Sequence, residues 1–165
     1  MKKRLVFIFE IFVIVFLLSA FVSALKINEF VTDPQTDWDG SGGNATSSDE
    51  WVEIFNDGLS SVNLTGWRID MNDGTNDTEI LQGEISSGDF FVILNPVDSI
   101  NNNGQILLYD NSSFLIDSVT YGTWDDGNTT DNAPTGNAVN ISDECVARIP
   151  NGADSGVDSD DFVKT

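Results

Sequence analysis

The chain has 165 residues, of which 27 are Asp or Glu, 7 are Lys or Arg and none is His, so its formal net charge is −20. This length predicts one domain with a hydrophobic core, and the acidic charge argues against nucleic-acid partners, because such binding rests on neutralising phosphates with Lys and Arg. The absence of His excludes Ser-His-Asp and Cys-His catalysis, together with most zinc and haem sites.

Residues 1–24 have the layout of a secretory signal peptide: a basic start, an apolar run over 5–22 and small residues before Ala24. We predict cleavage after Ala24 and an extracellular or cell-surface protein. The alternative is an uncleaved membrane anchor, because the apolar run is about long enough to span a bilayer. Glu10 argues against the anchor, since a carboxylate near a helix centre costs about 2.5–3.5 kcal/mol on insertion scales. Cleavage would leave 4 basic and 26 acidic residues and a charge of −22.

From residue 25 onward, short apolar runs alternate with clusters of Gly, Asn, Asp, Ser and Thr. This pattern is typical of a β-sandwich or barrel built from many short strands. Two segments, 32–49 and 122–143, read as long loops, where function or disorder usually lies. The predicted strands are residues 25–31, 50–56, 62–70, 78–82, 89–95, 104–110, 114–121 and 144–150.

The stretch DEWVEIFN, residues 49–56, contains two glutamates that could be paired catalytic carboxylates. Successive side chains of a strand point to opposite faces, so Glu50 should share a face with Val52 and Ile54, and Glu53 should lie on the other face. A general acid and a general base must converge on one substrate atom. We therefore interpret both glutamates as structural.

Several motifs appear in a characteristic order: KINEF, DEWVEIFN, NLTGWRI, ISSGDFFVIL, QILLYD, LIDSVTYG and CVARIPNG. In this order they resemble a lamin tail domain of the secreted prokaryotic type, over about residues 26–162. The resemblance implies an immunoglobulin-like β-sandwich that acts as an interaction module. It also implies that Gly66 permits a tight backbone path and that Trp67 is the central core aromatic. Within its 165 residues the sequence departs from the pattern, because it contains neither a catalytic domain nor a Pro-Gly-rich tail. Two readings stay open: a fragment of a longer protein, or a short chain.

The segment DWDGSGGN in the first long loop is the best candidate for a metal site. Read as a calcium loop, it places Asp37, Asp39 and Ser41 at the first, third and fifth ligand positions and Gly42 at the turn. The twelfth position is Ser48 instead of Glu, with Asp49 and Glu50 following. The alternative is a polar loop whose Asp side chains cap turns. DSGVDSDD, residues 154–161, is a weaker second candidate.

Six Asn-X-Ser/Thr sequons fit a glycosylated exported surface, provided that the source organism has that pathway. The alternative is a loop composition rich in Asn and Thr. The sequons begin at Asn44, Asn63, Asn76, Asn111, Asn128 and Asn140. Cys145 is the only cysteine, so no intrachain disulfide can form, and we interpret it as a small buried hydrophobe instead of a reactive thiol.

Together these features predict an exported, non-enzymatic, immunoglobulin-like module that spans residues 25–165 and binds a surface protein or glycan. A membrane contact is expected only if residues 1–24 remain attached. One rival function is an acidic hydrolase with a metal in the 32–49 loop, and the missing His and the diverging glutamates count against it. The other rival is a structural component of the cell envelope, which would self-assemble.

Overall fold

The computed structural model describes residues 25–42, 48–97, 100–136 and 143–165. The predicted signal peptide or anchor, residues 1–24, and the sequons at Asn44 and Asn140 lie outside these ranges. The elements are β1 (Leu25–Val31), β2 (Trp51–Asn56), β3 (Val62–Asn63), β4 (Arg68–Asn72), β5 (Asn76–Ile80), β6 (Glu84–Ile85), β7 (Phe90–Leu94), β8 (Gly104–Tyr109), β9 (Leu115–Tyr121), β10 (Val146–Arg148), α2 (Asp158–Asp161) and β11 (Phe162–Lys164).

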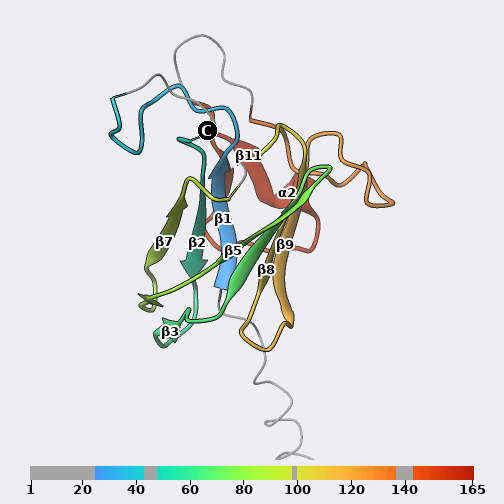
Figure 1. The fold of residues 1–165 in the computed structure, drawn as a ribbon. Coiled ribbons are helices and arrows are strands. Elements are labelled where there is room, and N and C mark those ends of the chain that lie inside the picture. Colours follow the sequence, from blue (N-terminus) through green and yellow to red (C-terminus); the bar gives the residue numbers. More distant parts are fainter. Residues whose placement is uncertain (1–24, 43–47, 98–99, 137–142) are drawn as a thin grey trace, which may run out of the picture.

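The strands form two principal antiparallel sheets that face each other across the core (Figure 1). The first sheet has the order β11-β10-β1-β2-β7, the second has the order β5-β4-β8-β9, and β3 and β6 form a small separate pair. This arrangement confirms the predicted all-β sandwich. Among the described residues, no helix is long and apolar enough to cross a membrane.

The core lies between the inner faces of the two sheets, where strand alternation places the apolar side chains. Ile27 and Ile54 come from the first sheet, and Ile106 and Val119 come from the second; all four are fully buried. At one end of the core, the Phe30 ring packs against two further aromatic residues, Tyr121 and Phe162, with centroid distances of 4.8 Å and 5.9 Å. These three rings form a buried aromatic cluster at that end of the core.

The structure corrects three expectations from the sequence. Residues 62–70 do not form one strand, because the chain turns between β3 and β4 at Gly66, whose φ of +82° favours glycine. Trp67, expected at the centre of the core, is half-buried and packs at its edge. Cys145 is half-buried, whereas we expected it to be buried.

A buried arginine joins the two sheets near the C-terminal elements. The guanidinium of Arg148, on β10, donates to the Asp117 carboxylate on β9 (3.3 Å) and to the Asp161 carboxylate on α2 (3.1 Å). Its Nε donates to the carbonyl of Ile27 on β1 (2.8 Å), and the guanidinium lies 4.4 Å from the centre of the Phe162 ring. Because Arg148 is only 1% exposed, this charge is held almost entirely by protein groups.

Candidate metal site and the surrounding carboxylates

Glu50 and Glu53 lie on opposite sides of the first sheet, as the alternation predicted. Glu50, just before β2, is 5% exposed, and its carboxylate accepts a hydrogen bond from the Ile100 backbone N–H. Burial raises the pKa of Glu50 to about 7, and the hydrogen bond from Ile100 opposes this shift. Glu53 is half-buried and accepts a hydrogen bond from Nδ2 of Asn28 (2.9 Å). The two carboxylates therefore have separate partners and do not form a catalytic pair.

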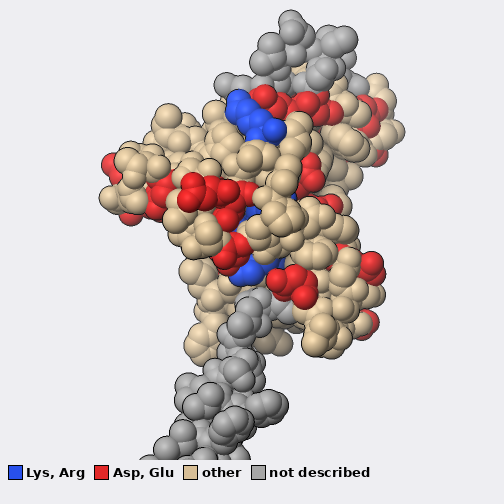
Figure 2. Space-filling model, turned by 180° about the vertical axis from the view of Figure 1, so that it is seen from behind, with Lys and Arg blue, Asp and Glu red and all other residues tan. Residues whose placement is uncertain are grey.

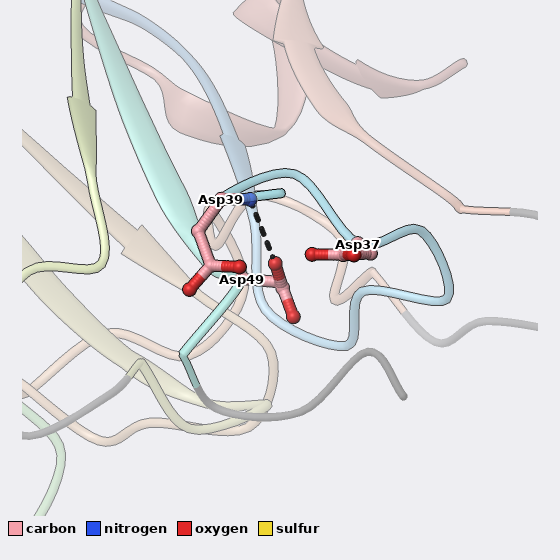
Figure 3. Close-up of side chains that lie close together, drawn as sticks. All are labelled: Asp37, Asp39 and Asp49. Carbon is pink, nitrogen blue, oxygen red and sulfur yellow. Dashed lines mark hydrogen bonds between the residues drawn. The ribbon is translucent and has the colours of Figure 1, made fainter. Parts of the chain in front are cut away.

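Among the described residues, Asp37, Asp39 and Asp49 form a group of three carboxylates close enough to share a metal ion (Figure 3). One oxygen from each carboxylate lies within 4.8 Å of the other two. Asp37 and Asp39 come from the loop after β1, and Asp49 comes from the return of the same loop just before β2. Asp49 is 1% exposed, so its carboxylate forms the buried side of the cluster.

Backbone N–H groups hold the carboxylates in this arrangement. The Asp39 N–H donates to Oδ1 of Asp49 (3.0 Å), which ties the two arms of the loop together (Figure 3). The Ser41 N–H donates to Asp37 (3.0 Å) and to Asp39 (2.8 Å), and the Gly42 N–H donates to Asp37 (2.8 Å). The backbone hydrogen bond from Ser41 is the main cause that lowers the pKa of Asp39, and side-chain hydrogen bonds with Ser41 and Asp37 lower it further.

The structure brings two of the three predicted metal ligands together and gives the third a different contact. Asp37 and Asp39 converge, whereas Ser41 lies beside them and donates its backbone N–H to both. Asp49 completes the set from a position one residue beyond the expected twelfth ligand. The mismatch at Ser48 was a signal that the loop departs from the calcium-loop spacing, but spacing alone does not show that Asp49 folds back onto Asp37.

An exposed aromatic side chain lies next to this cluster. Trp38, between the two loop aspartates, is 46% exposed. Its ring meets the ring of Trp51 edge to face, with a centroid distance of 6.0 Å, and Trp51 is nine-tenths buried. The buried ring therefore supports the exposed one, and together they anchor the acidic loop to β2.

The second acidic segment, residues 154–161, uses its carboxylates to bind the chain's own groups. Asp154 forms an ion pair with Lys26, and Asp161 accepts hydrogen bonds from the Ser155 N–H and from Arg148. Asp158 accepts a hydrogen bond from the Thr120 N–H (2.7 Å). The segment is a structural connection, and its carboxylates do not converge into a metal-binding group among the described residues.

The sequence analysis did not predict the hydrogen-bond and ion-pair network of Arg148. The sequence did contain an indication of it, because Arg148 stands between Ala and Ile in an apolar strand, and a buried arginine must be paired. Its partners, however, lie 31 and 13 residues away in the sequence. Figure 2 shows one face of the molecule, on which Asp and Glu atoms (red) lie beside Lys and Arg atoms (blue).

Four predicted glycosylation positions lie within the described residues, and all four are exposed: Asn63, Asn76, Asn111 and Asn128. Two of them already act in local turns, because Asn63 Oδ1 accepts the Thr65 N–H (2.8 Å) and Asn128 Oδ1 accepts the hydroxyl of Thr130 (2.7 Å). Exposure leaves the four asparagines accessible to modification and does not by itself indicate that modification occurs.

The two facing antiparallel sheets form a β-sandwich of the immunoglobulin-like class. A family model described as Lamin Tail Domain matches residues 19–123, more than half of the chain, and the chain belongs to this family. The match covers β1 to β9, and β10, α2 and β11 follow it. Lamin tail domains are non-catalytic immunoglobulin-like domains. A search of curated proteins found no match.

Proposed function

We propose that this protein is an exported, non-enzymatic binding module that attaches to a protein or glycan at the cell surface. The family membership carries the proposal, since lamin tail domains are non-catalytic. The divergence of Glu50 and Glu53 supports it, because it removes the most obvious catalytic carboxylate pair. The contact surface is the end of the sandwich that presents the exposed Trp38 and the carboxylates beside it. Aromatic rings with adjacent polar groups suit both sugar faces and protein surfaces.

The loop at this end is proposed to hold a calcium ion between Asp37, Asp39 and Asp49. Calcium takes oxygen ligands at about 2.4 Å, so two oxygens on one ion lie no more than about 4.8 Å apart. The three carboxylates meet this limit. Backbone carbonyls and water would complete the six to eight ligands that calcium requires. The ion would offset repulsion among the carboxylates and stiffen the loop that carries Trp38.

Thermal melts in chelator and in calcium test the metal proposal. Binding to the folded state alone adds about 2.7 kcal/mol at a hundredfold excess over the dissociation constant. We expect calcium to raise the melting temperature of the wild type and to have little effect on Asp37→Asn/Asp39→Asn. The control is Asp57→Asn/Asp160→Asn, which removes two exposed charges elsewhere. In about 0.15 M salt, where exposed charges are screened beyond roughly 8 Å, equal calcium shifts in all three proteins would reject the site.

A glycan and protein array, probed with the purified protein and followed by mass spectrometry of bound ligands, tests the binding function. We expect retention of one ligand class without any change in its mass, and weaker retention by Trp38→Ala. Cleavage products would favour the acidic hydrolase instead. Concentration-dependent assembly in sedimentation, without a retained ligand, would favour the envelope component.

Two measurements test the proposed export and the proposed glycosylation. N-terminal sequencing of the exported protein should begin at Leu25, whereas Met1 retained in a membrane fraction would support the anchor. Mass spectrometry before and after enzymatic removal of N-linked glycans should show whether Asn63, Asn76 and Asn111 are modified. An unchanged mass would assign these sequons to turn chemistry alone.

A further inference from the structure

The open edge of β7 is a surface that the proposed function does not use. β7 pairs with β2, and no described strand pairs with its other side. At one end of the β2–β7 ladder, the Asn56 N–H donates to the carbonyl of Asp89 (3.0 Å). At the other end, the Asn95 N–H donates to the carbonyl of Glu50 (2.8 Å). Backbone groups alternate in direction along a strand, so odd-numbered residues here face β2 and even-numbered residues face the open edge.

Three residues therefore present their backbone N–H and C=O groups to this edge: Phe90, Val92 and Leu94. Their side chains are also exposed, by 44%, 52% and 41%. Sheet edges are usually protected by a charge, a proline or a bulge. β7 has none of these, since its sequence is FFVIL and its pairing with β2 has no register shift. Such an edge is a template for an added strand.

A cleft lies beside this edge, between the two sheets. β5 is the edge strand of the second sheet, and residues 79–82 together with residues 91–94 line a space of about 290 Å³. Its β7 side is apolar, with Phe91 and Ile93 in the lining, and Leu81 adds an apolar side chain from the β5 side. The volume is close to the lower end of the range for ligand pockets, about 300 Å³. The cleft therefore has room for side chains of an added strand.

The β5 side of the cleft contributes one carboxylate, that of Glu79. Cross-strand partners share a face of the sheet, and Glu79 is paired with the fully buried Ile69, while Asp77 is paired with the buried Met71. Both carboxylates therefore lie on the inner side of β5, and Glu79 lines the cleft directly. Apolar walls beside a carboxylate suit a side chain with a long aliphatic stem and a positive end.

The described part of the chain does not supply a cation to this position. Its four Lys and Arg side chains all form ion pairs elsewhere: Lys26 with Asp154, Arg68 with Asp70, Arg148 with Asp117 and Asp161, and Lys164 with Glu144. The whole chain carries a net charge of −20. A second copy would bring an uncharged β7 and further carboxylates to the cleft, so charge complementarity favours a basic partner.

We propose that an extended basic segment of a partner protein adds to β7 as a further strand and closes the cleft between β7 and β5. Its inward side chains are Lys or Arg, whose stems pack on Phe91 and Ile93 while their charged ends reach Glu79. Its outward side chains are apolar and pack beside Val92 and its exposed neighbours. The inference adds a class of partner to the proposed binding module and does not depend on the calcium loop.

Fluorescence anisotropy with a labelled ten-residue peptide of alternating Lys and Val tests the proposal, in about 0.15 M salt. A peptide of alternating Glu and Val is the charge control. Val92→Pro removes an N–H that faces the open edge, so it keeps the β2 ladder and blocks strand addition. Val92→Thr keeps the N–H and is the matched control. Glu79→Gln removes the proposed cation partner, and Asp160→Asn removes an exposed charge on α2.

We expect the Lys peptide to bind at least tenfold more tightly than the Glu peptide. Val92→Pro should weaken binding at least tenfold and Glu79→Gln several-fold, while Val92→Thr and Asp160→Asn should stay within about twofold of the wild type. Circular dichroism checks the fold, and Val92→Lys, which repels a basic strand, replaces the proline variant if that variant unfolds.

Equal peptide binding by the wild type and Val92→Pro would overturn the proposal, because binding would then follow net charge alone. Self-association that Val92→Pro abolishes would also overturn it, since a second copy would then occupy the edge. If the protein binds the Lys peptide but no ligand on the glycan and protein array, the proposed surface ligand is rejected and the inference about β7 stands. If it binds an array ligand but not the Lys peptide, only the inference about β7 is rejected.

Discussion

Replacing Arg148 with Met should be among the most damaging single changes in the protein. Arg148 is 1% exposed and neutralises Asp117 and Asp161, whose side chains are each 6% exposed. Methionine fills part of the volume but leaves both carboxylates without the cation that compensates them. Breaking a buried ion pair in this way costs about 3–5 kcal/mol, a large part of the roughly 5–15 kcal/mol that stabilises a typical domain.

The loss should depend on pH. Burial raises the pKa of Asp117 even with Arg148 and the Ile27 N–H opposing that shift, so removing the guanidinium raises it further. The pKa of an Asp side chain in the unfolded chain is about 3.9. When the pKa in the folded protein is higher, the stability linked to that group is fully present at a pH below the unfolded pKa, and it is lost as the pH rises through the folded pKa. The free energy of unfolding that Arg148→Met loses relative to the wild type should therefore be largest at pH 7 and above, and smaller in acid.

Urea unfolding at pH 5 and pH 7.5, with Arg68→Met as the control, measures both effects. Arg68 pairs with Asp70 at 3.2 Å, but their side chains are 24% and 25% exposed, so its loss should cost only about 1 kcal/mol. Adding Asp117→Asn to Arg148→Met should cost less than the sum of the two single changes. The reasoning is refuted if Arg148→Met costs no more than Arg68→Met, or if its deficit grows in acid.

Two further predictions concern the core and the C-terminal elements. Trp67→Ala should lower the free energy of unfolding by about 1.5–3 kcal/mol, because the side chain is half-buried. Phe30→Ala should lower it by about 3–5 kcal/mol, as large truncations in cores do. Urea unfolding that shows the opposite order would place Trp67 at the core centre. Burial, aided by the nearby Asp117 and Asp131, raises the pKa of Asp158 to about 6, so its contribution to stability is lost as pH rises through about 6. Asp158→Asn should therefore melt above the wild type at pH 7.5 and near it at pH 4, and an identical pH profile for both proteins would contradict this.

The carboxylate cluster of Asp37, Asp39 and Asp49 shows how far loop spacing can predict which side chains converge. The alternate Asp37 and Asp39 indicated two converging ligands because both lie in one short turn. Asp49 lies ten residues further on, and its approach to Asp39 depends on where the loop re-enters β2. A spacing rule cannot supply that return path, because the anchoring contact between Trp38 and Trp51 is tertiary.

Trp67 marks a different limit. The resemblance to a family placed an aromatic residue at the core, and its position beside the Gly66 turn was predicted. Trp67 is only partly buried against the core, and the burial of a side chain is set by tertiary packing that its local sequence does not determine. The fully buried aromatic cluster is instead that of Phe30, Tyr121 and Phe162, because β1, β9 and β11 bring these rings together at one end of the sandwich.

By itself, the sequence determined the class of fold and the faces of β2. Alternation of apolar and polar residues is a local property of a strand, and it holds for Glu50, Val52 and Ile54 whatever lies beside them. The tertiary structure alone decided which strands have neighbours on both sides. The segment FFVIL lies in the strand predicted over 89–95, but one edge of its backbone is open because β2 is its only partner in the described part of the sheet. The Arg148 network has the same origin, since its charges meet only when β1, β9, β10 and α2 pack together, and packing is a property of the whole chain.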